Sequence, residues 1–427
     1  MREMKDSGMP WIGKIPKDWK TDKFKYHLKR SEPRNPGNQV VLSLYRDYGI
    51  IPKDSRDDNH NVTSEDTSNY KYVQIGDFVV NKMKAWQGSV AVSNYEGIVS
   101  PAYYVYKFSD HQIYKKYLHY LLRACYKDEF MRLSGGLRVG QWDLSADGLG
   151  NTYILIPPYD EQVKIADYLD SKKERIDSIR EGVEAEIEAL KEYKKSVITE
   201  AVTKGLDPDV EMKDSGIPWI GEIPKEWVIC KVKNVVSHIG SGTTPTSGKI
   251  EFYENGTVNW IQSGDLYETN KINETNKKVS ESAIKLFPAL HIYKAKFIVI
   301  AMYGASVGNI AISNIDACVN QACCCIKTNE FNNLKYMFYW LFSCKNDFLK
   351  ITDGGGQPNI SQTKIKNQYY LKPPIEEQHR IVDFLDTKCA RIDSIIQKKQ
   401  ELLTNLDTYK KSLIYEYVTG KKEVPAV

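Results

Sequence analysis

Two blocks of this sequence occur twice, and this repetition constrains the fold more than any other feature. The block from Met4 to Trp19 recurs from Met212 onward, an offset of 208 residues, and the block that begins at Pro157 recurs at Pro373, an offset of 216. The sequence between the paired blocks matches poorly. Such a chain predicts two units that share a frame but differ in content, and that perform one task on two different targets.

Length and composition are those of an ordinary soluble protein. The chain has 427 residues, of which 41% are hydrophobic and 27% charged, so it is long enough for two or three domains with their own cores. Its longest apolar runs, such as Phe297 to Met302, are too short to cross a bilayer, and its start lacks the apolar segment of a signal peptide. We therefore expect a cytoplasmic protein without membrane contact.

The net charge of +4 is weak support for nucleic-acid binding. A DNA-binding protein of this size has to gather its Lys and Arg on one face while acidic helices lower the total. The eight cysteines include no Cys-x-x-Cys pair, and Cys323 to Cys325 are consecutive within an apolar stretch. This pattern predicts buried free thiols rather than a metal site.

Several segments imitate enzyme motifs without fulfilling them. Gly242 to Lys249 resembles a phosphate loop, but five residues separate its glycines where four are needed, and Ile250 replaces the magnesium-binding Ser or Thr. Ile156 stands where the Pro-Pro-Tyr loop of amino-methyltransferases needs a polar residue, and Asp209 lies too close to Glu211 for a nuclease carboxylate cluster. We find neither a glycine loop for AdoMet nor a Ser/His/Asp trio. No catalytic residue and no cofactor are expected in this chain.

Two segments show the seven-residue apolar periodicity of coiled-coil helices. Each follows a Pro-Pro pair, carries acidic residues in its first turn and ends near a Gly, and Lys399 interrupts the second stripe. Helices of about 40 residues, roughly 60 Å long, with so narrow a stripe do not stay single in water. We expect them to pair as an antiparallel coiled coil; the alternative is two amphipathic helices, each packed on its own domain. The predicted partner-binding residues are Ile176, Val183, Leu190, Val197, Ile392, Leu402, Leu406 and Leu413.

The segments before the two helices have a mixed α/β pattern. Strands are expected at 103–107, 297–300 and 323–327, and amphipathic helices near 114–126 and 334–349. The predicted fold class is therefore α+β, with two similar mixed α/β domains joined by two long helices and related by pseudo-two-fold symmetry. The expected boundaries are 1–157 for the first domain, 158–204 for the first long helix, 205–373 for a linker and the second domain, 374–421 for the second long helix and 422–427 for a tail.

The doubled frame resembles the specificity subunits of type I restriction-modification systems. The resemblance is carried by Met-Lys-Asp-Ser-Gly-x-Pro-Trp-Ile-Gly-x-Ile-Pro-x-x-Trp in both halves and by Pro-Pro-x-x-Glu-Gln-x-x-Ile at the start of each long helix. Asn81 to Gly88 and Gly97 to Tyr104 look like a familiar first target-recognition domain, and Gly242 to Pro245 looks like its counterpart in many such domains. Together these segments cover almost the whole chain.

This resemblance implies a non-catalytic subunit that gives a larger enzyme its DNA specificity. Each target-recognition domain would read one half of a bipartite site in double-stranded DNA, and the paired helices would hold two methyltransferase subunits, which restriction subunits join. AdoMet, ATP and Mg would then belong to the partner subunits. Independently of the family, two similar readers on a stiff rod should contact one face of a duplex, with half-site centres near one helical turn apart, about 34–36 Å.

The residues that read DNA are predicted from side-chain chemistry and position. Base edges call for Arg, Lys, Asn or Gln, and phosphates call for Lys, Arg, Ser, Thr or backbone N–H groups. Apart from such contacts, Trp86 and Tyr303 could be core aromatics, and the glycine loops could be simple turns. The candidates are Lys82, Lys84, Trp86, Gln87, Arg138 and Gln141 in the first unit and Ser241, Thr243, Thr244, Tyr303, Ser306, Gln357 and Asn359 in the second.

Two other functions remain open at this stage. The first is a self-sufficient DNA methyltransferase or nuclease, against which the absent AdoMet loop and Ile156 count. The second is a coiled-coil adaptor without a DNA role, which would lack the steep salt dependence of a DNA binder. If the coiled coil carries partner subunits, the chain alone should expose apolar strips and be poorly soluble.

Overall fold

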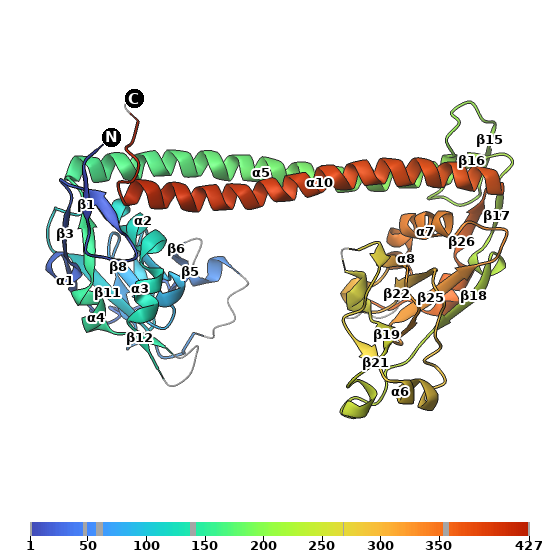
Figure 1. Ribbon diagram of the computed structural model, residues 1–427, viewed down its shortest axis with the longest axis horizontal. Helices are drawn as coiled ribbons and strands as arrows, with labels where there is room; N and C mark the ends of the chain where they lie inside the picture. The colour runs from blue at the N-terminus through green and yellow to red at the C-terminus, as the bar shows by residue number, and fades with distance from the viewer. Residues whose placement is uncertain are drawn as a thin grey trace. The chain divides into compact units, whose positions relative to one another are not determined.

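The computed structural model describes residues 2–45, 49–56, 63–136, 142–267, 269–352 and 358–425. The chain divides into two compact units, Met1–Glu184 with Gln400–Val427 (unit 1) and Ala185–Lys399 (unit 2). Each unit therefore combines one mixed α/β domain with parts of both long helices, which Figure 1 shows as the green and red ribbons.

The two long helices are α5 (Tyr159–Lys204) and α10 (Ile375–Val418). Both begin directly after a Pro-Pro pair and carry two acidic residues in their first turn, where negative charge is favourable to the helix dipole. Helix α5 is followed by Gly205, with φ of +77°, and α10 is followed two residues later by Gly420, with φ of +68°. These are helix stop signals at the predicted positions.

Within each unit α5 and α10 run antiparallel, as the heptads predicted. Unit 1 has two ion pairs between these helices. The second pair lies three residues later than the first on α5 but three residues earlier on α10, as antiparallel helices require. Unit 2 contains two further ion pairs between the same helices, one of which uses Lys399 at the interrupted heptad position. The ion pairs are Asp177–Lys410 and Arg180–Asp407 in unit 1, and Lys194–Asp393 and Glu186–Lys399 in unit 2.

The domain of unit 1 is built on an antiparallel sheet in the order β4-β11-β8-β9. Strand β8 is apolar over most of its length and buried throughout, so it occupies the middle of the sheet, and its Val79 lies opposite Val105 of β11. Helix α2 packs against β9 of this sheet and shares a hydrophobic core with residues of α5 and α10. The elements are β1 Met4–Asp6, β2 Lys14–Pro16, β3 Lys20–Lys23, α1 Phe24–His27, β4 Leu28–Arg30, β5 Leu42–Tyr45, β6 Gly49–Pro52, β7 Lys71–Val73, β8 Phe78–Asn81, β9 Val90–Val92, β10 Gly97–Val99, β11 Tyr103–Phe108, α2 Lys115–Cys125, α3 Lys127–Arg132, β12 Ser134–Gly135, β13 Asp143–Leu144, α4 Ala146–Asn151 and β14 Tyr153–Ile156.

The domain of unit 2 repeats this plan with a larger sheet, β18-β25-β22-β23-β20, and a second sheet, β21-β19-β24. Strand β20 pairs with β23 in parallel, which has no counterpart in the main sheet of unit 1. The elements are β15 Met212–Asp214, β16 Glu222–Pro224, β17 Val228–Lys231, β18 Val236–Ser241, β19 Val258–Ile261, β20 Lys271–Ile272, β21 Lys278–Val279, α6 Glu281–Leu286, β22 Phe297–Ala301, β23 Ile310–Ser313, β24 Ala317–Val319, β25 Cys323–Thr328, α7 Leu334–Ser343, α8 Lys345–Lys350, α9 Gln362–Asn367 and β26 Tyr369–Lys372.

One local expectation needs adjustment and another is confirmed. The predicted helix at 334–349 is two helices, α7 and α8, because the chain turns at Cys344, where ψ is 0°. Unit 1 has the same break at Tyr126, between α2 and α3. The three consecutive cysteines, Cys323 to Cys325, are fully buried in β25, which confirms the prediction of buried free thiols.

Candidate nucleic-acid interface

The repeated sequence blocks become repeated hydrogen bonds. Trp19 and Trp227 are both fully buried, and each indole Nε1 donates to the first-turn glutamate of the long helix in its own unit. The distances are 3.0 Å from Trp19 to Glu161 and 2.9 Å from Trp227 to Glu377. These tryptophans are packing anchors, as their recurrence suggested, and they fix the entry of each domain against the start of a long helix.

A second pair of contacts is made by glutamines that are completely buried. Gln162 accepts a hydrogen bond from the backbone N–H of Tyr114 at 2.8 Å, and Gln378 accepts one from the backbone N–H of Asn333 at 2.9 Å. Each glutamine also donates from Nε2 to the carbonyl of the proline five residues earlier. The Glu-Gln pair of the repeated block thus holds the loop before α2 or α7.

Each unit also fastens its short helix to the far end of the other long helix. The hydroxyl of Tyr117 in α2 donates to the carbonyl of Val418 at the end of α10, and the hydroxyl of Tyr336 in α7 donates to that of Val202 near the end of α5. Because these carbonyls lie in the last helical turn, where no helical N–H is available to them, the tyrosines satisfy acceptors that would otherwise be buried without a partner.

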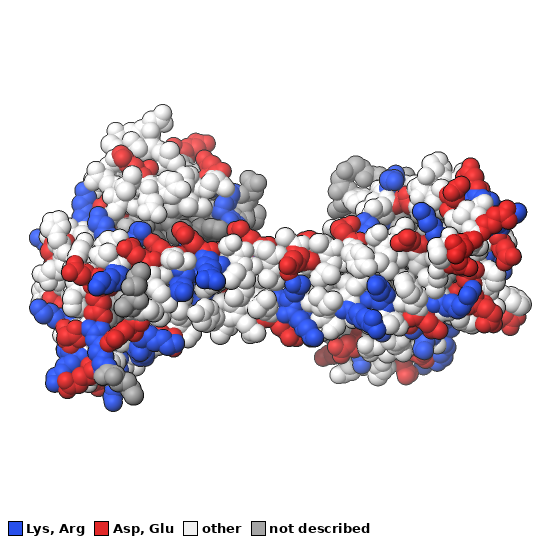
Figure 2. Space-filling view, turned by 90° about the horizontal axis from the view of Figure 1, so that it is seen from above, with Lys and Arg blue, Asp and Glu red and all other residues white. Residues whose placement is uncertain are grey.

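The apolar heptad positions are mostly occupied by contacts within the chain. Ile176, Val183, Ile392 and Leu413 are buried, whereas Leu402 is 41% exposed. The buried positions therefore face the other long helix or the domain rather than solvent, and the binding of a partner at these eight residues stays a prediction. The remaining three, Leu190, Val197 and Leu406, are half-buried. In the view of Figure 2, Lys and Arg side chains alternate with Asp and Glu side chains along these helices.

The DNA-reading candidates of unit 1 come together in the connection between β8 and β9. Lys84 is exposed, and Trp86 and Gln87 lie in the short 3-10 turn Ala85–Gln87. Trp86 is half-buried and lies 6.0 Å from Trp142 between ring centroids, so it forms part of a surface pair rather than of the domain core. Lys82 forms an ion pair with Asp143 at 3.0 Å, and this carboxylate compensates the positive charge of the lysine.

The corresponding connection of unit 2 joins β22 to β23. Tyr303 is 41% exposed, which excludes the interpretation of a core aromatic. Its backbone pairs with Asn359 in an isolated bridge, and its carbonyl accepts a hydrogen bond from the hydroxyl of Ser306 at 2.9 Å. Tyr303 and its neighbour Ser306 therefore lie together with Asn359, a candidate far along the chain. Gly308 closes this turn with φ of +79°, as Gly88 closes that of unit 1 with φ of +89°, and both positions favour glycine.

Ser241, Thr243 and Thr244 form a separate group at the end of β18. Ser241 donates to the carbonyl of Cys323 at 2.8 Å, and Thr244 donates to the side chain of Gln321 at 2.5 Å. Gly242 is required between them because a Cβ atom there would lie 1.7 Å from the carbonyl oxygen of Val319. The remaining candidates, Arg138, Gln141 and Gln357, lie outside the described residues.

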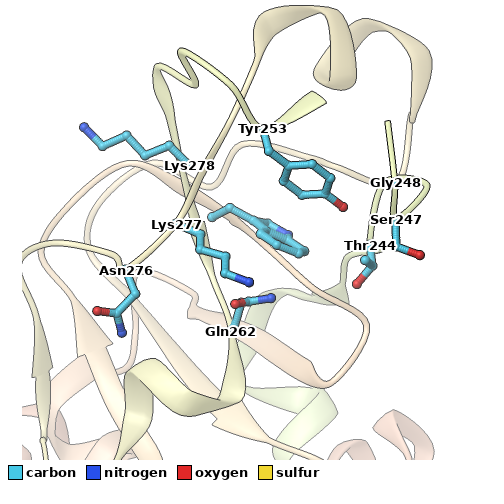
Figure 3. A pocket seen from close by; sticks show the side chains of 9 residues that line it. Thr244, Ser247, Gly248, Tyr253, Gln262, Asn276, Lys277 and Lys278 are labelled. Atoms are coloured by element: carbon cyan, nitrogen blue, oxygen red, sulfur yellow. The ribbon is translucent and has the colours of Figure 1, made fainter. Parts of the chain in front are cut away.

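Residues that the sequence did not single out line a cavity of about 520 Å³ beside Thr244. Figure 3 shows the Tyr253 side chain facing the Thr244 and Ser247 side, and Lys277 extending toward Gln262. These residues come from loops and strand ends that are distant in sequence, and they match no motif. The only sequence signal was the glycine-rich segment at one side of the cavity.

The buried thiols of β25 have raised pKa values, as cysteines with a purely structural role do. Burial raises the pKa of Cys324 to about 12, and it raises that of Cys325 well above its usual value. Both are therefore protonated at neutral pH and lack the thiolate character of a nucleophile or metal ligand. Within the part of the chain that the structure describes, no cluster of three or more His, Cys, Asp or Glu side chains is placed to hold a metal ion.

His238 in β18 lies near a second histidine and two lysines. Burial, followed by the nearby His291, Lys327 and Lys366, lowers the pKa of His238. The His238 and His291 rings are stacked at 5.8 Å between centroids.

No helix among the described residues is both long and apolar enough to cross a membrane.

Comparison with known proteins gives a consistent result over nearly the whole chain. A family model described as the type I restriction modification DNA specificity domain matches residues 25–189 and again residues 224–404. The type I restriction enzyme MjaVIII specificity subunit of Methanocaldococcus jannaschii is 25% identical over 96% of this chain and 94% of its own length. The EcoR124I/EcoR124II specificity subunit of Escherichia coli is 26% identical over 49% of this chain and 51% of its own.

Solved structures with the same fold include two that cover nearly the full length. A chain from a study of complex assembly and conformational transition in the type I R-M system superimposes with a TM-score of 0.72 at 15% identity, covering 96% of this chain and 99% of that one. The HsdS subunit from Thermoanaerobacter tengcongensis gives a TM-score of 0.55 at 16% identity, covering 96% and 98%. Both support the architecture of two mixed α/β domains with long helices.

Proposed function

Because this chain belongs to the type I restriction-modification DNA specificity family, we propose that each of its two units reads one half of a bipartite DNA site. The chain is a specificity subunit, and its domains serve as target-recognition domains on a shared helical frame. The observation that carries the proposal is a contrast between parts of the two units: the tryptophan–glutamate hydrogen bonds of the frame recur in both, while the 3-10 turns of the β8–β9 and β22–β23 connections have different sequences.

The partners in this proposal are double-stranded DNA, two methyltransferase subunits and the restriction subunits. The methyltransferase subunits would dock on the long helices, where exposed apolar side chains remain after the helices have paired. These side chains include Ile179, Tyr193, Ile395, Leu402 and Tyr409, each more than 40% exposed. AdoMet, ATP and Mg would be bound by the partners, and this chain would supply specificity without catalysis.

Two observations support a non-catalytic role over a self-sufficient methyltransferase. Ile156, which takes the place of the polar residue in an amino-methyltransferase loop, is an apolar strand residue that is only 7% exposed. Glu211, at the imitation of a nuclease cluster, forms an ion pair with Lys225 at 2.6 Å in the repeated frame. Its counterpart Glu3 forms the equivalent pair with Lys17, so the contact belongs to the frame.

The long helices give a direct test of the bipartite reading. Removing seven residues from α5 and seven from α10 at paired positions keeps the heptad phase and shortens each helix by about 10 Å, at 1.5 Å per residue. The recognised spacer should then become shorter while both half-sites keep their bases. Methylome sequencing of cells that carry the shortened chain with its methyltransferase partner measures both properties together, and an unchanged spacer would contradict the proposed role of the helices.

Single substitutions in the two strand connections test the assignment of the half-sites. Lys84→Ala in unit 1 and Ser306→Ala in unit 2 should each alter recognition at one half-site only. The matched control is Lys233→Ala, because Lys233 is an exposed lysine on a 3-10 turn outside both connections. Altered recognition of both halves by one substitution would mean that the units do not read DNA separately.

A further inference from the structure

The cavity beside Thr244 has a lining suited to an anion. It measures about 520 Å³, and its walls include Tyr253, Trp260, Gln262, Lys277 and Lys278, with no Asp or Glu among the lining residues. Among the described residues neither Lys277 nor Lys278 forms an ion pair, unlike Lys17 and Lys225 of the frame or Lys194, Lys399 and Lys410 of the long helices. Two uncompensated positive charges at one cavity create a local field that attracts negative groups.

A buried hydrogen-bond donor in the same wall has no partner. Trp260 is 1% exposed, and its indole Nε1 makes no hydrogen bond to any described residue. A buried N–H without a partner is destabilising, so such a group in a cavity wall is a candidate for a contact with a ligand. The Tyr253 ring packs on Trp260 at 5.8 Å between centroids and holds the indole in place.

A third donor lies opposite. The backbone carbonyl of Gln262 accepts the backbone N–H of Asp265, and the Gln262 side-chain amide lines the cavity, where its NH2 group can donate. Figure 3 shows Gln262 and Lys277 directed toward one another across the cavity. The indole N–H, the amide NH2 and the Lys277 ammonium group are all donors, which is the requirement for binding an oxyanion, and Lys278, whose side chain extends away from Lys277 in Figure 3, adds its charge at the edge of the cavity.

We infer that this cavity binds a phosphodiester group of a DNA strand, with Lys277 and Lys278 compensating its charge and Trp260 and Gln262 donating to its oxygens. The inference rests on the proposed DNA-binding function and adds a backbone anchor to it. A volume of about 520 Å³ exceeds what an isolated phosphate ion needs and suits a phosphate with its flanking sugars. The neighbouring hydroxyls of Thr243 and Thr244 extend the polar surface along which a strand would continue.

An anchor of this kind positions the DNA without reading its sequence. The variant Lys277→Gln with Lys278→Gln in the full-length chain should therefore bind specific and random duplexes about 10-fold more weakly, by the same factor for both. It should also lower the slope of log affinity against log salt by about 0.9 for the phosphate contact that is lost. The control is Lys233→Gln, which removes an exposed lysine of the same unit that does not line the cavity.

A second variant separates the neutral donor from the charges. Trp260→Phe keeps an aromatic ring but removes the N–H, so affinity for both duplexes should fall about 3-fold to 10-fold while the salt slope stays unchanged. Melting curves of each variant show whether the fold is retained. Unchanged affinity and slope in the lysine variant would overturn the inference, as would a loss confined to one sequence, which would indicate base reading instead.

Two further measurements identify the source of the phosphate and separate the inference from the function. Inorganic phosphate and ATP are titrated into the full-length chain while Trp fluorescence is recorded. Saturation by either at low millimolar concentration, with DNA binding unaffected by the lysine variant, would assign the cavity to a free anion and overturn the backbone anchor. The slope measured on random duplexes does not require a bipartite site, so it is informative even if the chain shows no preference for gapped sequences.

Discussion

Unit 1 and unit 2 share their frame and differ in what the frame carries. Asp170 accepts a hydrogen bond from the hydroxyl of Tyr120, and Asp386 accepts one from the hydroxyl of Tyr339, so α2 and α7 are fastened in the same way. By contrast, among the residues that the structure describes the main sheet has four strands in unit 1 and five in unit 2, and unit 2 adds a three-stranded sheet. A fixed support with exchangeable sheets and loops lets specificity change without loss of the contacts that place each reader.

The frame contacts should carry the largest effects on stability. Trp19→Ala and Trp227→Ala each remove a fully buried indole that is hydrogen-bonded to a helix-start glutamate, so each should cost about 3–5 kcal/mol. Since each contact lies within its own unit, Trp19→Ala should increase amide hydrogen exchange mainly in unit 1, and Trp227→Ala mainly in unit 2. Hydrogen-exchange mass spectrometry with peptides from both units measures this.

The conservative pair Trp19→Phe and Trp227→Phe serves as the control for that comparison. Phenylalanine keeps most of the buried ring and loses the hydrogen bond, so the loss should be about 1–3 kcal/mol and again similar in the two units. A large difference between the units for the same substitution would show that the repeated frame is not energetically equivalent, even though its geometry repeats.

Acid should distinguish the units through one position on the short helices. His119 of α2 is neutral in the folded chain because burial, helped by Arg123 and Lys173, lowers its pKa to about 3. At the corresponding place in α7, unit 2 has Phe338, which is buried and cannot titrate. His119 therefore makes unit 1 sensitive to pH in a range where the matching position of unit 2 is inert.

Because the pKa of His119 is lowered in the folded chain, acid should destabilise unit 1. Above the unfolded value of about 6.5 both states are neutral and nothing is lost; as pH falls toward 3, the unfolded state binds a proton that the folded state excludes. At pH 5 the free energy of unfolding of unit 1 should therefore be about 2 kcal/mol lower than above pH 6.5, because of His119 alone. His119→Phe should abolish that loss, and Phe338→His should create one in unit 2. Equal acid responses of wild type and His119→Phe in hydrogen exchange at pH 5 and pH 8 would contradict the prediction.

The sequence predicted those parts of the fold that depend on local periodicity. The long helices follow from heptads and Pro-Pro starts, and the central strand β22 follows from a continuous apolar run. The break at Cys344 was not visible in the expected helix 334–349, whereas the helix expected near 114–126 ends where α2 does. The parallel pairing of β20 with β23 was equally hidden, since it depends on residues about 40 positions apart.

Prediction of the candidate site was less complete for a physical reason. Tyr303 and Asn359 meet through a backbone bridge, and Lys82 meets Asp143 through an ion pair, so the availability of each side chain depends on partners that lie far along the chain. Lys277 was missed altogether, because a single lysine at a strand end carries no spacing signal. Its role becomes arguable only once Trp260 and Gln262 are seen at the same cavity.

The smallest expected difference between the units lies at the middle of the long helices. In unit 2 Lys399 pairs with Glu186, whereas in unit 1 the positions related by the 216-residue repeat are Val183 and Leu402. The Glu186 side chain is 60% exposed, so the ion pair is screened by water and salt and should contribute less than about 1 kcal/mol. A double-mutant cycle with Lys399→Ala and Glu186→Ala measures that coupling, which should decrease further in 1 M salt.

Replacing the pair by Val and Leu should leave stability within about 1 kcal/mol of wild type, because an apolar pair at heptad positions compensates for the lost charges. A coupling of several kcal/mol that persists in high salt would instead show that this ion pair, and not the apolar stripe, fixes the register of the two helices.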